Sequence, residues 1–189
     1  MWIYEHTPDN TARFVLGTQG DNPLVCFGIN PSTAEPNNLD PTVNLVSRVA
    51  TAHGHDSFLM FNVYPQRATN PDHLHRSVDP KLWWENDKYI AEQIAGRPLT
   101  IWAAWGTLIE KRDYLFACLN SIVNIPELQN CTWVSRGPIT KNGHPHHPLY
   151  VRKDSPFEPF DMQTYLKTEG RQNRDKFSTQ RESADEGNI

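Results

Sequence analysis

Apolar positions along the chain form short, nearly continuous runs that alternate with segments of helical periodicity. Runs of this kind are typical of strands that helices cover on both faces, as in a parallel sheet. A further short run at 12–16 predicts a strand that can pair with the next run across the turn at residues 21–23. The main predicted strands span residues 24–29, 57–63, 99–105 and 131–135.

Strong start signals precede the segments of helical periodicity. Aspartate at the N-cap, followed by proline at the first helical position, occurs at Asp40-Pro41 and again at Asp79-Pro80. Thr107 and Glu110 have the spacing of a capping box. The predicted helices span residues 41–53, 80–95 and 107–119, and glycines follow the first two.

The order of these elements predicts an α/β fold. Strands that alternate with helices form a three-layer α/β/α domain around a central, mainly parallel, four-stranded sheet. The chain has 189 residues, which is enough for one domain with a sizeable core, and we assign this domain to residues 1–167. Residues 168–189 are polar and mixed in charge, so we expect a disordered tail there.

Composition and charge narrow the class of protein. The chain has neither an apolar stretch near the ~18 residues of a membrane span nor an apolar leader after Met1, so we expect a cytoplasmic protein without membrane contacts. The net charge of −4 argues against tight general binding to nucleic acid but leaves room for local basic loops. Three cysteines without CxxC spacing indicate neither a disulfide framework nor a zinc ribbon.

Polar side chains lie where two predicted strands end. Asn30 follows the strand at 24–29, which Pro31 terminates, and Asn62 lies near the end of the next strand. A histidine loop, residues 143–150, follows the fourth strand. One strand-end asparagine alone is better explained as a turn residue. Because parallel strands end at one edge of a sheet, where ligands bind, these three features together favour a polar pocket.

The histidine loop leaves more than one interpretation open. His144, His146 and His147 offer metal-binding nitrogens, but they are crowded between prolines and lack an evident carboxylate or thiolate partner. We therefore expect no metal and no cofactor, and we prefer a rigid loop that presents one imidazole to the pocket over an exposed loop. Asp40 is expected to cap its helix, with a second role as a water-activating base left open.

These motifs resemble those of the uracil-DNA glycosylase superfamily. Gly28-Ile29-Asn30-Pro31 is similar to the first motif of the mismatch-specific branch, and Asn62 is similar to the asparagine that reads the base edge. The segment 101–106 resembles an apolar strand that ends in Trp-Gly. The histidine loop is similar to the His-Pro-Ser-Pro-Leu second motif, but it has one extra residue, so His144 or His147 can supply the functional imidazole.

The resemblance implies a monofunctional DNA glycosylase that flips a pyrimidine out and hydrolyses its N-glycosidic bond, leaving an abasic site. His144 would donate to the O2 atom of the departing base, Asn30 would orient water, and Asn62 would pair with the base edge. Leu149 would wedge into the gap in the duplex. The other residues assigned to the substrate are Phe27, Gly28, Ile29, Pro31, Ser32, Arg67 and His147, and those assigned to DNA are Pro145, Arg136 and Lys141.

The substrate prediction depends on one position. Ser32 is small where the uracil-strict branch has a tyrosine that blocks the C5 atom of the base, and the polar loop 33–39 adjoins it. We therefore favour a 5-modified cytosine, such as the glucosylated hydroxymethylcytosine of phage DNA, and hence a role in anti-phage defence. Repair of uracil or mismatches, hydrolysis of small nucleosides, and non-catalytic binding of a nucleotide or modified base are the alternatives.

The chain is also similar, as a whole, to a widespread family of uncharacterised bacterial and phage domains. That similarity rests on Asn-Pro-Ser-Thr-Ala, Asp-Pro-Thr and Arg-Ala-Thr segments. The expected partner is DNA that contains a modified base, and the expected oligomeric state is a monomer. The three segments span residues 30–34, 40–42 and 67–69.

Overall fold

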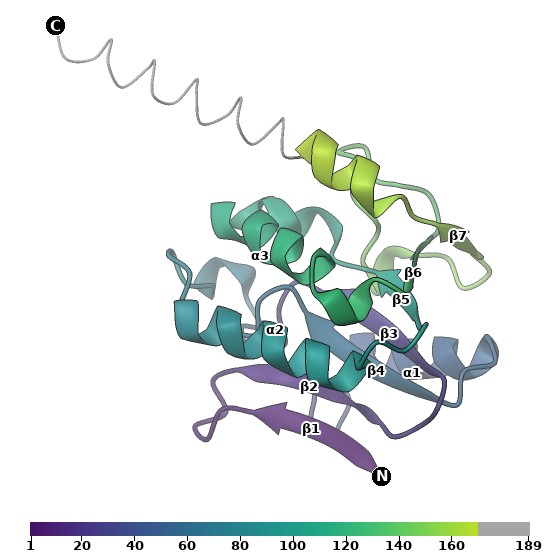
Figure 1. The fold of residues 1–189 in the computed structure, drawn as a ribbon, viewed down its shortest axis with the longest axis horizontal. Helices are drawn as coiled ribbons and strands as arrows, with labels where there is room; N and C mark the ends of the chain where they lie inside the picture. The colour runs from purple at the N-terminus through teal and green to yellow at the C-terminus, as the bar shows by residue number, and fades with distance from the viewer. Residues whose placement is uncertain (170–189) are drawn as a thin grey trace, which may run out of the picture.

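The computed structural model describes residues 1–169 as a mixed, seven-stranded sheet with helices on both faces (Figure 1). The order across the sheet is β1-β2-β4-β3-β5-β6-β7. The strands are β1 (Trp2–His6), β2 (Arg13–Thr18), β3 (Pro23–Gly28), β4 (Ser57–Asn62), β5 (Thr100–Ala103), β6 (Thr132–Arg136) and β7 (Phe157–Pro159).

The prediction of a mainly parallel, four-stranded sheet is wrong: the sheet has seven strands and is mixed, with both parallel and antiparallel pairs. The four predicted core strands are present as β4, β3, β5 and β6, and they are parallel to one another. Three antiparallel strands extend this core: β1 and β2 beside β4, and β7 beside β6. β7 is short and ends in a proline, a residue that weakens any strand pattern in the sequence.

The expected pairing of the 12–16 strand with 24–29 is also wrong. β2 lies between β1 and β4, because the backbone bond from Thr7 N to Ala12 O closes a local turn that joins β1 to β2. β3 instead pairs with β4 on one edge and with β5 on the other, which leaves no free edge for β2. The α/β class itself is confirmed.

The helices begin largely where the sequence indicates. Asp40 Oδ1 accepts the N–H of Val43 at 2.9 Å, and Asp79 caps the second helix in the same way. The start at Thr107 is wrong: a 3₁₀ segment comes first, because the Glu110 side chain bonds to His144 instead of closing a capping box. The α-helices are α1 (Pro41–Ala52), α2 (Pro80–Ile94) and α3 (Asp113–Val123), and residues 162–169 are also helical. The 3₁₀ segments are η1 (Pro71–His73), η2 (Gly106–Lys111), η3 (Pro126–Leu128) and η4 (Pro148–Tyr150).

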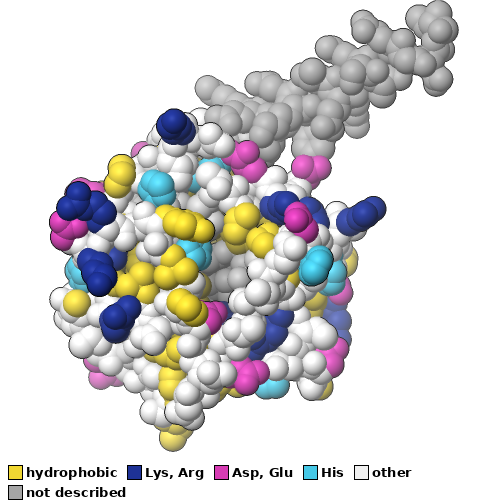
Figure 2. Space-filling model, turned by 180° about the vertical axis from the view of Figure 1, so that it is seen from behind, with side chains coloured by type: hydrophobic (Ala, Val, Ile, Leu, Met, Phe, Trp, Pro, Cys, Tyr) yellow, Lys and Arg dark blue, Asp and Glu magenta, His cyan; other side chains and the backbone are white. Residues whose placement is uncertain are grey.

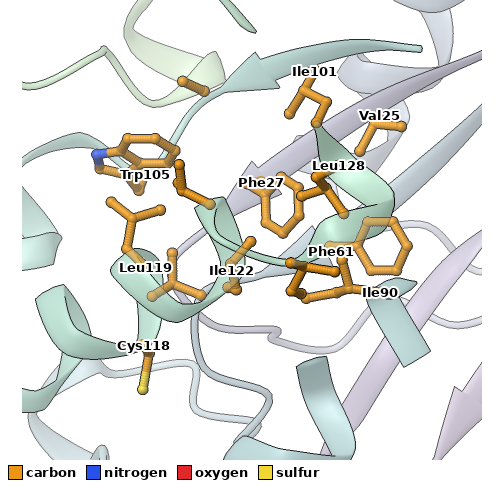
Figure 3. Packing of buried hydrophobic residues seen from close by; sticks show 14 of the residues in the cluster. Val25, Phe27, Phe61, Ile90, Ile101, Trp105, Cys118, Leu119, Ile122 and Leu128 are labelled. Atoms are coloured by element: carbon orange, nitrogen blue, oxygen red, sulfur yellow. The ribbon is translucent and has the colours of Figure 1, made fainter. Parts of the chain in front are cut away.

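Three layers result, with α1 on one face of the sheet and α2 and α3 on the other (Figure 1). Successive strand residues point to opposite faces, so each core strand contributes to two cores. Phe27 and Phe61 stack at 5.4 Å between ring centroids in the core beneath α2 and α3, among the side chains of Ile90 and Ile122 (Figure 3). Cys26 and Met60 belong to the core on the α1 face.

Hydrogen bonds continue past the last paired residues of β3 and β4. The N–H groups of Val63 and Tyr64 donate to the carbonyl oxygens of Gly28 and Ile29, each at 2.9 Å, and Ala68 N donates to Pro31 O. These bonds clamp the segment after β3 to the segment after β4. The two strand-end asparagines are therefore held close to one another.

The C-terminal part of the predicted tail, residues 170–189, lies outside the described residues. Residues 168 and 169 belong to the helix at 162–169. Within the described part of the chain, no helix is both long and apolar enough to cross a bilayer.

Candidate functional site

A small cavity, which we call the strand-end cavity, lies where β3 and β4 end. Its volume is about 140 Å³. Cavities for drug-sized ligands span ~300–1,000 Å³, whereas one of ~150 Å³ holds a single benzene ring. The strand-end cavity is therefore the size of one flat ring. Its polar lining comprises Arg13, Asn30, Ser32, Asp40, Thr42, Asn62, Thr69 and His147.

Asn30 is held in one orientation at the cavity wall. Its Nδ2 atom donates to Ala68 O at 2.8 Å and to Pro31 O at 3.0 Å. The side-chain oxygen Oδ1 is the atom that remains to accept a hydrogen bond from water or a ligand. Gly28, Ile29 and Pro31 line the cavity beside it, as the resemblance implied.

Asn62 faces the same cavity from the end of β4. Its Oδ1 accepts a bond from Arg13 Nη2 at 3.2 Å, and its backbone oxygen accepts one from Asn86 of α2 at 2.9 Å. Gly28 leaves room for the amide, because a Cβ at this glycine would lie 3.1 Å from Asn62 Nδ2. Since Oδ1 is occupied, Nδ2 is the group that Asn62 offers as a donor to a ligand.

Arg13 completes this wall, and the sequence analysis did not identify it. The side chain is 1% exposed and has no acidic partner within salt-bridge distance among residues 1–169; Nη1 donates to Ala34 O, and Nε has no hydrogen-bond partner there. Burial, with a smaller contribution from the charge of Arg67, lowers the pKa of the guanidinium to about 10. Arg13 is therefore still a cation at neutral pH.

A β-bulge directs Arg13 toward the cavity. The pairing of β1 with β2 moves from Glu5–Val15 to His6–Arg13, so Phe14 is an inserted residue. Phe14 stacks on Tyr89 of α2 at 4.8 Å, on the same face as Val15. Arg13 thus points to the α1 face, where Asn62 also lies. An arginine within an apolar strand is the one sign in the sequence that points to this role.

His147 contributes an imidazole from the histidine loop. Its Nδ1 accepts the Leu149 N–H at 3.3 Å, which places the proton of the neutral ring on Nε2. Burial lowers the pKa of His147, and the Asp40 carboxylate partly opposes this shift. The ring is therefore neutral at pH 7. Asp40 lies on the same cavity wall while its Oδ1 caps α1.

His144 is fully buried and does not line the strand-end cavity. The Tyr165 hydroxyl accepts a bond from Trp105 Nε1 at 3.0 Å and also bonds to His144 Nδ1 at 2.8 Å. His144 Nε2 donates to Glu110 Oε1 at 2.7 Å. We call these four residues the histidine network. Of these four residues, Trp105 is the one that lines the cavity.

A side groove of about 370 Å³ adjoins the cavity and shares Ser32, Ala68 and Thr69 with it. Ser32 Oγ lies 3.2 Å from Thr69 Oγ1, and the backbone oxygen of Ser32 accepts a bond from Arg67 Nη1. Arg67 is thus tied into the wall of the groove. The other lining residues of the side groove are Asn10, Thr33 and Glu35.

The remaining predicted site residues are spread over several places. Leu149 is 48% exposed and does not line the cavity, whereas Pro145 is buried and its carbonyl oxygen accepts the N–H of Gly106. Lys141 is exposed in a separate hollow near Tyr165, and Arg136 is 3% exposed at the end of β6. Phe27 belongs to the core beneath α2 and α3, away from the cavity.

Within residues 1–169, no three His, Cys, Asp or Glu side chains cluster closely enough to hold a metal ion. The expectation that the protein needs neither metal nor cofactor stays a prediction.

The chain matches one protein family over residues 13–149, the family described as a protein of unknown function, DUF1643. No curated protein and no solved structure matches the chain. The family match includes the segments 30–34, 40–42 and 67–69, and it contains Arg13, Asn30, Asn62 and His147. Since the match covers most of the sequence, this chain belongs to the DUF1643 family.

Proposed function

We propose that this protein is a DNA glycosylase that removes a modified pyrimidine from DNA. The observation that carries the proposal is the strand-end cavity, which has the size of one ring and joins Asn30, Asn62 and His147 with the buried cation of Arg13. Such a cavity accepts a base only after the base leaves the helical stack. The resemblance of the Gly-Ile-Asn-Pro segment to glycosylases agrees with this chemistry.

Arg13, Asn62 and His147 favour departure of the base as an anion. When the bond between the sugar C1′ and the base nitrogen breaks, the base retains the electron pair and becomes negative. A donor that is fixed in a site without water stabilises such charge more strongly than it would in solution. Asn62 Nδ2 and the Nε2–H of His147 are neutral donors, and Arg13 adds a permanent positive charge. In this proposal His147 takes the role that the resemblance implied for His144.

Asn30 orients the attacking water, and Asp40 accepts its proton. Asn30 is anchored through Nδ2, so its Oδ1 can accept a hydrogen bond from water and orient the water oxygen toward C1′. Water oxygen bonds to C1′ as the base departs, and the released proton passes to the Asp40 carboxylate. The products are an abasic sugar and a base that takes up a proton from solvent.

The side groove supports a substituted base as the substrate. A glucosylated base does not fit in 140 Å³, but the ring can occupy the strand-end cavity while its substituent passes Ser32 into the side groove. Asn10, Glu35 and Thr33 there carry the polar atoms that sugar hydroxyls need. We therefore favour a glucosylated 5-hydroxymethylcytosine, and with it a role in defence against phages that carry this base.

Abasic sites are the direct readout of this proposal. Purified protein is incubated with phage DNA containing glucosylated hydroxymethylcytosine, and with matched DNA containing uracil or plain cytosine, before alkaline cleavage of abasic sites. Wild-type protein should cleave the modified DNA, and Asn30→Ala should lower the rate per folded molecule by about a thousandfold. Ser32→Tyr should narrow the passage and reduce cleavage of glucosylated DNA more than that of uracil DNA.

Two results would contradict the proposal. Cleavage of uracil DNA alone would overturn the assigned substrate while keeping the enzyme class. Absence of abasic sites in every DNA, together with binding of the free modified base, would identify a non-catalytic binding module.

A further inference from the structure

A second and larger hollow, the basic groove, lies on the α1 face of the protein. Its volume is about 730 Å³, and it runs between α1 and the segment 148–153. Figure 2 shows hydrophobic side chains gathered around a hollow on this face, with lysine and arginine side chains beside them. The apolar wall includes Leu45 and Val49 of α1 and the exposed Leu149.

The charge of this groove has one sign. Arg48, Arg136 and Lys153 line it, and none of the described residues in its lining is an aspartate or a glutamate. The whole chain has a net charge of −4, so the positive charge of this groove is opposite in sign to that of the chain as a whole. A positively charged groove favours an anionic occupant.

Arg136 gives independent support for an anion. Its side chain is 3% exposed at the end of β6, where Nε donates to Ser155 O at 3.0 Å and Nη2 donates to Lys153 O at 2.6 Å. Nη1 is buried, with no hydrogen-bond partner among residues 1–169. A buried cation with an unused donor is costly unless a ligand compensates it. The same two bonds hold the loop that carries Lys153.

The basic groove lies next to the strand-end cavity along the chain. Asp40 and His147 line the cavity, and their chain neighbours Pro41 and Pro148 line the groove. Leu149, two residues after His147, also lines the groove. A polymer whose reacting unit occupies the cavity therefore has its next units beside this groove.

We propose that the basic groove binds an unpaired DNA strand next to the flipped nucleotide. Its phosphates lie against Arg48, Lys153 and Arg136, and its bases cover the apolar wall. Duplex DNA offers mainly phosphates and would leave that wall exposed, whereas an unpaired strand presents both charges and base faces. The inference rests on the proposed function, because it identifies the groove's occupant as the strand that carries the target base.

Binding of an oligonucleotide tests the groove without any need for cleavage. The probe is a fluorescent single-stranded oligodeoxynucleotide without modified bases, titrated with the full chain at several salt concentrations. The variant Arg48→Gln/Lys153→Gln should bind about tenfold more weakly at 0.1 M salt, and its slope of log affinity against log salt should be smaller by roughly 1.4, or ~0.7 per lost contact. Lys81→Gln and Lys88→Gln on α2 are the matched control, and they should bind like the wild type.

The outcomes separate this inference from the proposed function. Unchanged binding by the groove variant would overturn the inference even if abasic sites form. Equal affinity for a duplex of the same sequence, or equal competition by poly-glutamate, would also overturn it. Weaker binding by the groove variant in a protein that makes no abasic sites would support the groove and reject the glycosylase.

Discussion

Two imidazoles only three residues apart on the histidine loop have opposite environments. His144 is fully buried, and both of its ring nitrogens are engaged, with Tyr165 and Glu110. His147 lines the strand-end cavity, and its one bonded nitrogen only fixes the tautomer. Buried polar groups that are fully paired stabilise a fold, so His144 is suited to hold the loop and His147 to meet a ligand.

The same contrast separates the two regions around these histidines. The histidine network pairs each of its side chains within the protein, as in the chain from Trp105 through Tyr165 to His144. Among the described residues, the cavity wall instead buries Arg13 with no carboxylate within salt-bridge distance and with its Nε unpaired. Proteins retain such costly arrangements mainly where function requires them. Variants on each side of the contrast should therefore change different quantities.

The largest effect is expected for Arg13→Met. Loss of the cation from the cavity should lower the rate of abasic-site formation by about a thousandfold, since charge on the leaving base loses its strongest partner. The melting temperature should not fall, because the lowered pKa of Arg13 means that burial of its charge disfavours folding at neutral pH. Single-turnover rates and calorimetry measure the two quantities.

Arg76→Met is the matched control for that variant, because Arg76 is exposed and lines neither the strand-end cavity nor the basic groove. It should change neither quantity. If Arg13→Met lowers the melting temperature but keeps full activity, Arg13 is a structural residue. The cavity wall would then not differ in role from the histidine network.

His144→Ala should mainly reduce stability. The substitution removes two hydrogen bonds of a buried ring and leaves a void, which together destabilise by about 2–4 kcal/mol. Urea titration measures this loss, and activity per folded molecule at low temperature should stay within about threefold of the wild type. For His146→Ala, a variant in the same loop, the free energy of unfolding should differ from that of the wild type by less than about 1 kcal/mol. A stable but inactive His144→Ala would move the catalytic role to His144.

The opposite result is expected for His147→Gln, which should reduce activity and leave stability nearly unchanged. The rate of base removal should fall by about a hundredfold, since the glutamine lacks the aligned ring donor, while the free energy of unfolding should change by less than about 1 kcal/mol. Comparison with His144→Ala under identical conditions tests the contrast directly. Equal losses of stability in both variants would refute it.

Local patterns predicted the elements well, and the sites less completely. Both Asp-Pro helix starts and the four parallel strands depend on nearby residues, so the sequence sufficed for them. Asn30 and Asn62 meet at one cavity because parallel strands end together, as expected from the sequence. Arg13 escaped prediction because a one-residue bulge, invisible in the hydrophobic pattern, turns it to the other face.

The sequence also did not predict which of His144 and His147 faces the cavity. That outcome depends on Tyr165, which is far away in the sequence, and on Glu110, which the pattern had assigned to a helix cap. Residues on an irregular loop follow no period, so spacing alone does not tell which ring turns inward. Tertiary partners decide such cases.

The smallest expected effect is a pH dependence of His147. Burial places its pKa below the ~6.5 of an exposed histidine, so the unfolded chain takes up a proton at a higher pH than the native protein does. The contribution of the neutral ring to stability is therefore complete above about pH 6.5 and declines as the pH falls toward the lower native pKa. Activity should follow the same direction, because the imidazolium loses the Nδ1 acceptor for Leu149 N–H. Melting temperatures and rates between pH 7.5 and about pH 5 should show a steeper acid decline in the wild type than in His147→Gln, and activity that rises toward acid pH would contradict the neutral donor.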